Sequence, residues 1–145
     1  MVNEKINKKN QEQCQKFRCF FTSSKKMVIA GKNAKNNEEV IEQAEKNEQV
    51  LHTAKPGSPF VNIKSKKANK TDIKQAAVFC ALKSQDWRDN KSDVEVHIFK
   101  AQDVYKTKLM KTGTFGVKNF KIIKVKKQDI LKLEKKLKGG KIKSN

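Results

Sequence analysis

Residues 71–84, TDIKQAAVFCALKS, decide the fold, because their apolar side chains follow the repeat of an α-helix. From Ile73 the apolar residues recur at i, i+3, i+4, i+7 and i+8, which places them on one face. Thr71 stands where it can cap the first turn. Such a helix must bury its apolar face against another element, so Cys80, on that face, is predicted to be a core residue.

Short β-forming runs lie on both sides of this helix. Apolar and polar residues alternate most clearly at residues 94–99, VEVHIF. Further strands are predicted at residues 17–22 and 27–30, which form a hairpin, and at 50–53, 60–64, 115–117 and 120–125. A first helix is expected to be capped by Asn36 with Glu39 three positions later, and a last helix to run from Asp129 to the Gly139-Gly140 pair. This order predicts an α+β fold: a single domain with a mainly antiparallel sheet and two or three helices.

The chain has 145 residues, enough for one domain. Hydrophobic residues make up 36 % and charged residues 34 %, which favours a small core with polar ends. Residues 1–16 are predicted to be a disordered basic arm, because they hold almost nothing to bury. Residues 17–127 form the folded domain, and residues 128–145 an amphipathic helix with a basic tail.

The formal net charge of +19 is extreme for this length and predicts a polyanionic partner. All but two of the 34 basic residues are lysine, a skew that codon bias in an AT-rich genome would also produce. Such a bias would supply Glu as readily as Lys, yet Asp and Glu together number only 15. The excess of positive charge therefore indicates binding of a polyanion, and the common ones in a cell are nucleic acids and anionic membrane surfaces.

Cysteine usage and motif content limit the chemistry that the chain can perform. The three cysteines are odd in number and lack the paired spacing of a structural zinc site, so free thiols in a reducing compartment are expected. The N-terminus has no secretory signal, and no apolar run approaches the ~18 residues of a membrane span. No motif of a hydrolase, metalloprotease or P-loop enzyme occurs. We therefore expect a cytoplasmic binding protein that is not an enzyme, with no cofactor, no metal and no membrane partner.

Lysines gather at three points of the predicted fold: before the first helix, in the loop that enters residues 71–84, and along the last strand. This clustering, opposite a Glu-rich helix, indicates a phosphate-binding surface. Lysine lacks the bidentate fork with which arginine reads guanine, so we expect recognition of RNA shape and backbone. The predicted RNA-binding residues are Lys32, Asn33, Lys35, His52, Lys55, Gly57, Ser58, Lys66, Lys67, Lys70, Lys74, Lys121 and Lys124.

His52 opens a loop, HTAKPGS, that can offer a cation, backbone N–H groups and a hydroxyl to a phosphate. A purely structural role for His52 is the alternative, and His97, inside a strand, is expected to be structural. The turn at Lys32, the loop at residues 52–58 and the segment 66–74 are predicted to converge into one site.

Five motifs in a fixed order resemble a known family. They are residues 20–24 (FFTSS) with 27–38 (MVIAGKNAKNNE), 51–54 (LHTA), 56–61 (PGSPFV), 73–84 and 112–115 (TGTF). Over residues 17–127 they resemble the NFACT-R domain, the RNA-binding module near the C-terminus of the ribosome-quality-control factors once called fibronectin-binding proteins. The same module also occurs as free-standing small proteins.

The resemblance implies an RNA-contacting module, with tRNA or the rRNA of the large ribosomal subunit as target and a role associated with translation. Lys32 stands where the family has arginine, which keeps the charge but loses the bidentate geometry. Gln49-Val50-Leu51 replaces an acidic-aromatic pair that usually precedes the histidine. The full-length factors add further domains and a coiled coil, so the RNA-contacting module alone is implied here.

Two other functions fit the same composition. The protein could be an adaptor that docks on a protein partner, with its charge serving only to localise it. It could also be an accessory subunit of an RNA-modification or quality-control complex in which another protein does the chemistry. Non-specific binding of duplex DNA is a further possibility, because lysine discriminates weakly between phosphates.

Overall fold

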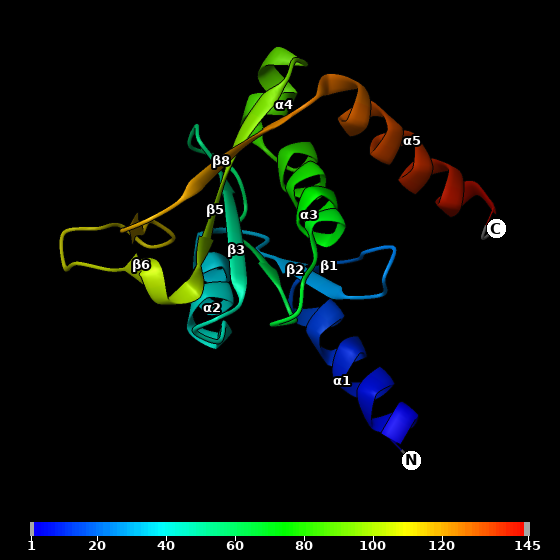
Figure 1. Cartoon of the computed structure of the whole chain (residues 1–145), viewed down its shortest axis with the longest axis horizontal. Coiled ribbons are helices and arrows are strands. Elements are labelled where there is room, and N and C mark those ends of the chain that lie inside the picture. The colour runs from blue at the N-terminus through cyan, green and yellow to red at the C-terminus, as the bar shows by residue number, and fades with distance from the viewer. Residues whose placement is uncertain (1, 144–145) are drawn as a thin grey trace.

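The computed structural model describes the backbone of residues 2–143 and the side chains of residue 8 and residues 10–138. It confirms the α+β class, with a six-stranded main sheet in which all neighbouring strands are antiparallel (Figure 1). The strand order is β1 (Arg18–Phe21), β2 (Met27–Ala30), β4 (Val61–Ile63), β3 (Gln49–Thr53), β5 (Val94–Lys100) and β8 (Lys121–Val125). Because β4 lies between β2 and β3, the ends of β2 and β3 meet the start of β4 at one end of the sheet.

Five α-helices occur over the described residues, more than the two or three that the sequence predicted. They are α1 (Val2–Lys16), α2 (Ala34–Gln43), α3 (Lys70–Leu82), α4 (Gln85–Asn90) and α5 (Lys127–Lys143). A 3₁₀ turn, η1 (Ala101–Asp103), leads into a small second sheet, which consists of β6 (Val104–Tyr105) and β7 (Gly116–Val117). We refer to residues 104–117 as the β6–β7 ribbon.

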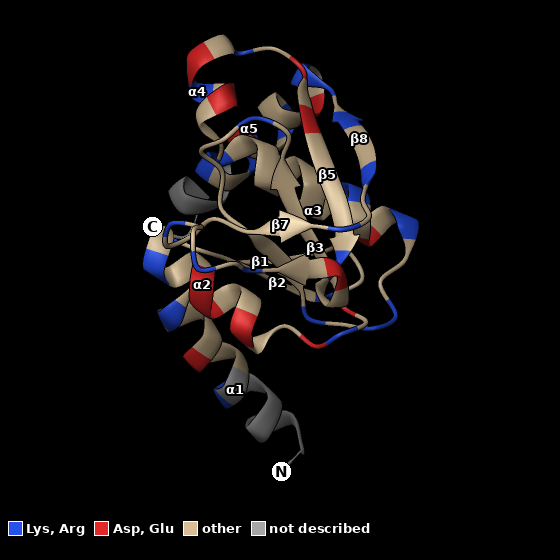
Figure 2. Ribbon diagram, turned by 90° about the vertical axis from the view of Figure 1, so that its left-hand side faces the viewer, with Lys and Arg blue, Asp and Glu red and all other residues tan. Residues whose placement is uncertain are grey.

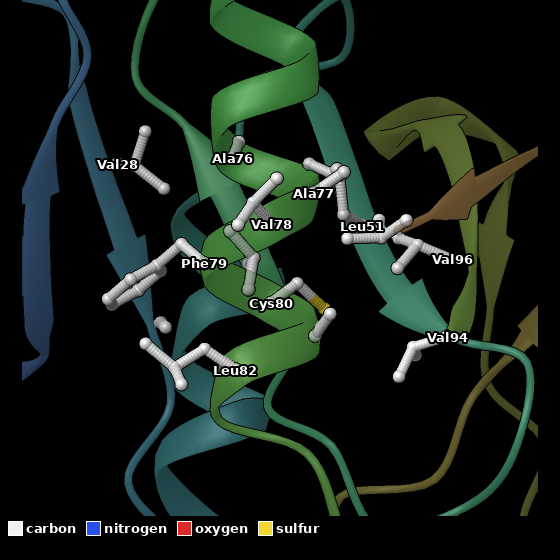
Figure 3. Close-up of a cluster of buried hydrophobic side chains, with 14 of the residues drawn as sticks. Val28, Leu51, Ala76, Ala77, Val78, Phe79, Cys80, Leu82, Val94 and Val96 are labelled. Carbon is white, nitrogen blue, oxygen red and sulfur yellow. The ribbon is translucent and has the colours of Figure 1, made fainter. Parts of the chain in front are cut away.

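The apolar face of α3 forms the larger core, as its spacing predicted. Ala76, Ala77 and Cys80 are fully buried against Leu51 and Val96 of the sheet (Figure 3). Cys80 is thereby confirmed as a core residue, and burial raises the pKa of its thiol to about 12. α5 closes the same face through the buried Ile130 (Figure 1).

The opposite face of the sheet carries a smaller core. Side chains alternate along each strand, so Val50 and Phe99 point away from α3 and pack with Phe60. α2 covers this face through Val40, and the β6–β7 ribbon covers it through Val117. The sheet is therefore covered on both faces, and the smaller core positions the site described below.

The helices α2 and α3 are each capped by an asparagine that precedes the predicted capping residue. The cap lies three residues earlier than predicted for α2 and two residues earlier for α3. The N-cap of α3 is Asn69, whose side chain accepts from the N–H of Asp72, while the Asp72 carboxylate accepts from the N–H of Asn69. The N-cap of α2 is Asn33, which accepts from the N–H of Asn36. Thr71 and Asn36 lie inside their helices because each preceding asparagine is extended and supplies the capping oxygen.

The capping carboxylate of Asp72 also fixes the β1–β2 turn. The Ser24 hydroxyl donates to Asp72 at 2.6 Å, and the Lys26 ammonium lies 3.1 Å from it. Burial on its own would raise the pKa of Asp72, but these donors and the Asn69 N–H together outweigh it and lower that pKa well below the ordinary value. A fully buried carboxylate therefore joins α3 to a turn of the distant hairpin.

Within residues 1–16, which the sequence predicted to be a disordered basic arm, the described backbone forms the helix α1 from Val2 to Lys16. The C-terminal end of α1 is joined to the rest of the domain by a disulfide and an ion pair, and not by packing in a core. A disulfide joins Cys14 to Cys19 of β1, and the Lys16 ammonium pairs with Glu39 of α2 at 3.0 Å. The expectation of three free thiols is wrong, since Cys14 and Cys19 are joined and only Cys80 is unpaired among the cysteines.

The structure differs from the sequence prediction in two further helices, α4 and α5. α4 was not predicted, because its six residues show no apolar repeat and it depends on a cap by Ser84. α5 continues through Gly139-Gly140 to Lys143, since glycine weakens a helix without forbidding it. No helix in the described part of the chain is both long and apolar enough to cross a membrane.

Candidate nucleic-acid interface

A cleft of about 640 Å³ opens at the end of the sheet where β2 and β3 finish and β4 begins. Its walls come from the turn at residues 31–37, from the loop at residues 53–60 and from the β6–β7 ribbon. Figure 2 shows β7 lying across the sheet beside β3, on the side that α2 covers. Segments that are far apart in the sequence therefore build one hollow, which we call the cationic cleft.

Four basic side chains line the cationic cleft: Arg18, Lys32, Lys83 and Arg88. No Asp or Glu is among the described residues that line it. Arg88 is held by uncharged acceptors, since it donates to the Gln85 side-chain oxygen at 2.9 Å and to the Lys83 carbonyl at 3.3 Å. Its orientation is fixed, and none of the ion pairs among the described side chains neutralises its charge, which is an arrangement suited to an anionic ligand.

Aromatic rings form the floor of the cleft. Phe60 and Phe99 are buried, and the Phe60 ring contacts His52 at a centroid distance of 4.4 Å and Phe115 at 5.2 Å. At the opening, the half-exposed Phe120 stacks on His97 with centroids 4.2 Å apart. The cleft therefore combines apolar ring faces with positive charge and contains both histidines of the chain.

His52 is held as a neutral ring. Burial lowers its pKa, and the neighbouring His97 acts in the same direction, while the Thr53 carbonyl opposes them. Because a carbonyl can only accept, His52 Nδ1 donates to the Thr53 oxygen, at 2.7 Å. In the neutral tautomer that this bond selects, Nε2 is left as a hydrogen-bond acceptor.

The loop at residues 53–60 is rigid because its polar groups are used within it. The buried Ser58 hydroxyl accepts from the Thr53 N–H at 3.0 Å and donates to the Pro59 carbonyl at 3.1 Å. Gly57 adopts φ +93°, and its carbonyl accepts from the N–H of Gln85 at the start of α4. The loop therefore anchors α4 and with it Arg88.

The turn at residues 31–37 is equally well packed. Gly31 donates to the Phe60 carbonyl, and the Asn37 side chain accepts from the Phe60 N–H at 3.0 Å. The Asn37 side-chain oxygen occupies the space that a Cβ on Gly31 would need, so only glycine fits there. Lys32 follows on the exposed side, where its ammonium donates to the Gln15 carbonyl at the end of α1.

The structure brings together two of the three predicted segments. Lys32, Asn33, His52, Gly57 and Ser58 all line the cleft. The oxygens of Asn33 and Ser58 are used as a helix cap and a loop bond, so these two residues shape the cleft.

Two predicted lysines lie beside the cleft without lining it. Lys55 is on the same loop and pairs with Asp86 at 3.6 Å. Lys35 is exposed in the first turn of α2.

The prediction that residues 66–74 converge on this site is wrong. β4 starts at the cleft and runs away from it, so Lys64 bonds to Met27 at the other end of β2. Lys66 pairs with Glu45 there, Lys67 lies in the turn before α3, and Lys70 and Lys74 lie in the first two turns of α3 at the same end.

The two predicted lysines of β8 lie on opposite faces of the sheet. Lys121 is paired with Ile98 of the larger core and Lys124 with Glu95. Lys121 lines a separate hollow of about 770 Å³ together with Lys70. These lysines are therefore not part of the cationic cleft.

The sequence reasoning missed Arg18, Lys83, Arg88 and Phe120, and it treated His97 as structural. One signal could have found the arginines: in a chain with 34 basic residues only two are arginine, and both line the cleft. Figure 2 shows acidic residues along α2. This expected acidic face is partly neutralised, because Glu39 pairs with Lys16 and Glu38 with Lys106.

The cleft has cations at its rim and aromatic rings at its floor, and it lies at the end of an antiparallel sheet that is covered on both faces. These features are typical of an α+β domain that binds polyanions. The family model of the NFACT protein RNA binding domain matches residues 16–119. The chain therefore belongs to the NFACT RNA-binding domain family, and this membership supports a role in RNA binding. A search of curated proteins finds no match.

Among solved structures, the fold is similar to the C-terminal part of the fibronectin/fibrinogen-binding protein from Streptococcus suis, with a TM-score of 0.69 and 20 % sequence identity. The similarity covers 76 % of this chain and 45 % of that one, so the present chain spans less than half of the solved relative. At this level of identity the likeness establishes the fold alone.

Proposed function

We propose that this protein binds structured RNA through the cationic cleft and acts in translation, with tRNA or ribosomal RNA as its target. The observation that carries the proposal is the set of four cations in a cleft without acidic lining residues, within a chain of an RNA-binding domain family. The net charge of +19 adds a long-range attraction for any polyanion.

Recognition is expected to depend on backbone phosphates and on RNA shape. The planar fork of arginine matches the oxygens of a phosphate, and the Arg88 fork is already oriented by Gln85 and Lys83. Contacts of this kind position an RNA without reading its sequence.

A binding role without covalent chemistry is also part of the proposal. The hydroxyl of Ser58 is used within its loop, and burial leaves the Cys80 thiol protonated. Among the described residues, no group of three His, Cys, Asp or Glu side chains could hold a metal ion. The engagement of the Ser58 hydroxyl and the protonation of the Cys80 thiol favour a module that holds RNA for another factor.

The test compares two double charge reversals that change the net charge equally. Arg18→Glu/Arg88→Glu alters the cleft, whereas Lys67→Glu/Lys74→Glu alters exposed lysines at the other end of the sheet. Binding of tRNA and of a ribosomal RNA fragment is measured by fluorescence anisotropy, with thermal melting as the check on folding. The cleft variant is expected to lose about a hundredfold in affinity, at ~1.5 kcal/mol for each charge-assisted contact.

Equal losses in the two variants would show that only bulk charge matters and that the cleft is not the site. Absence of RNA binding by the unmodified protein would favour the adaptor role. The RNA species is tested separately, by crosslinking the protein to RNA in cells and sequencing the attached RNA.

A further inference from the structure

We propose that the cationic cleft holds one unpaired nucleotide, whose base lies against the aromatic floor while its flanking phosphates lie on Arg18 and Arg88. This inference rests on the proposed function and names the form of RNA that the site selects. It predicts a preference for RNA with a bulged or overhanging nucleotide over a fully paired duplex.

The size of the cleft sets the first limit. A volume of about 640 Å³ lies within the range of pockets that enclose a single small molecule. A duplex is far too wide to enter such a hollow, so only a nucleotide that leaves the helical stack can reach the floor.

The chemistry of the lining changes with depth. Phe60 and Phe99 at the floor are each 4 % exposed, whereas Lys32 and Arg88 at the rim are exposed to solvent. A nucleotide has the same division, with an apolar base face and a charged phosphate. Phe120, 48 % exposed and stacked on His97, offers a ring surface at the opening on which a base can stack.

His52 adds a polar contact of the right kind. Since Nδ1 donates to the Thr53 carbonyl, the neutral ring presents an acceptor rather than another positive charge. An acceptor suits a ribose hydroxyl or the amino group of a base, and it does not suit a phosphate. The interior of the cleft is thus matched to the uncharged part of a nucleotide.

Basic residues at the rim of the cleft indicate where the RNA on either side of the inserted nucleotide can continue. Arg18, Lys83 and Arg88 also line a neighbouring hollow of about 420 Å³ between α4 and α5. Lys91 and Lys138 line this second hollow together with a single acidic residue, Glu134. Phosphates on either side of an inserted nucleotide therefore find cations in both hollows.

The experiment uses two RNA hairpins with the same number of phosphates, one blunt and one with a short 3′ overhang. The first unpaired base of the overhang is 2-aminopurine, whose fluorescence falls when it stacks on a ring. The overhang RNA is expected to bind about tenfold more tightly than the blunt hairpin, with quenching of the fluorescence on binding.

Phe120→Ala should remove most of this preference and the quenching, because it should weaken binding of the overhang RNA more than binding of the blunt hairpin. Phe21→Ala is the matched control, because Phe21 is 45 % exposed on β1 and lies outside the cleft. Equal affinity for both hairpins together with unquenched 2-aminopurine in the unmodified protein overturns the inference, even if Phe120→Ala fails to fold. If the Arg18→Glu/Arg88→Glu variant still loses affinity in that case, the proposed function stands without the nucleotide pocket.

Discussion

His52 and His97 face each other directly across β3 and β5, and both side chains lie on the face of the sheet that forms the cleft. A charge on His97 would discourage His52 from taking up a proton. Burial has the larger effect on His52 and lowers its pKa, so this ring stays neutral when an ordinary histidine would become charged.

The lowered pKa of His52 predicts a loss of stability in mild acid. Below the ordinary value of 6.5 the unfolded chain binds a proton that the folded chain resists, so the free energy of unfolding falls as pH falls through this range. The slope from one such group cannot exceed about 1.4 kcal/mol per pH unit. Urea unfolding at pH 7.5 and at pH 5.5 measures this change in the free energy of unfolding. His52→Gln should show a shallower dependence, and an identical slope in the variant would contradict the assignment to His52.

The carboxylate of Asp72 predicts a second dependence on protonation, at lower pH. Its pKa is lowered, so its contribution is complete above the ordinary value of 3.8 and is lost as pH falls below that value. Asp72→Asn removes the charge that accepts from Ser24 and pairs with Lys26, and it should cost about 2–3 kcal/mol in urea unfolding at pH 7. The control is Asp89→Asn on the surface of α4, which should change stability by less than about 0.5 kcal/mol.

The periodic elements of the fold could be predicted from the sequence, because their patterns are local. The repeat from Ile73 and the alternation at residues 94–99 correspond to α3 and β5. Helix starts were misplaced because Asn33 and Asn69 compete with nearby capping residues, and only the backbone conformation decides between them. α1 could not be predicted, since its described contacts with the domain are one disulfide and individual polar pairs rather than an apolar face.

The candidate site was predictable only where it follows a turn motif. Lys32, His52 and Gly57 lie on segments whose glycines and prolines mark loops at strand ends. Arg18 and Arg88 reach the cleft through the pairing of β1 with β2 and through the docking of α4 on Gly57, which are tertiary relationships. The order of β4 between β2 and β3 likewise decides that residues 66–74 lie at the other end of the sheet.

Gly57 is predicted to control the placement of Arg88. Its φ of +93° disfavours any side chain, and an added Cβ would lie 2.8 Å from Cβ of Gln85. Gly57→Ala should therefore cost about 1–2 kcal/mol of stability and displace α4, with a loss of RNA affinity. Melting and RNA binding are measured on the same sample at a temperature where the variant is folded. Unchanged RNA affinity in a destabilised variant would show that α4 does not position Arg88 for RNA.

Removal of residues 1–16 is predicted to leave a cooperatively folded domain. The cores begin at Phe17, and none of the described side chains of residues 8–16 belongs to either core. The truncation removes the Cys14–Cys19 disulfide, whose contribution should stay below about 3 kcal/mol because the loop it closes is short. Cys14→Ser/Cys19→Ser in the full chain separates the effect of the disulfide from that of α1. Loss of a sharp thermal transition on truncation would show that α1 is required for folding.

The dependence of RNA binding on salt is predicted to reveal how many phosphates the protein contacts. If ~6 cations meet phosphates, affinity should fall about a thousandfold between 50 and 200 mM salt, because each contact releases a bound counterion. Arg18→Ala/Arg88→Ala should lower the slope of log affinity against log salt by about 2, one unit for each lost phosphate contact. Lys67→Ala/Lys74→Ala lowers the net charge equally but should leave the slope almost unchanged, since these lysines lie away from the cleft.

A flat salt profile for the unmodified protein would refute phosphate contacts altogether. Equal changes of slope in the two variants would instead locate the binding on the whole charged surface rather than in the cleft.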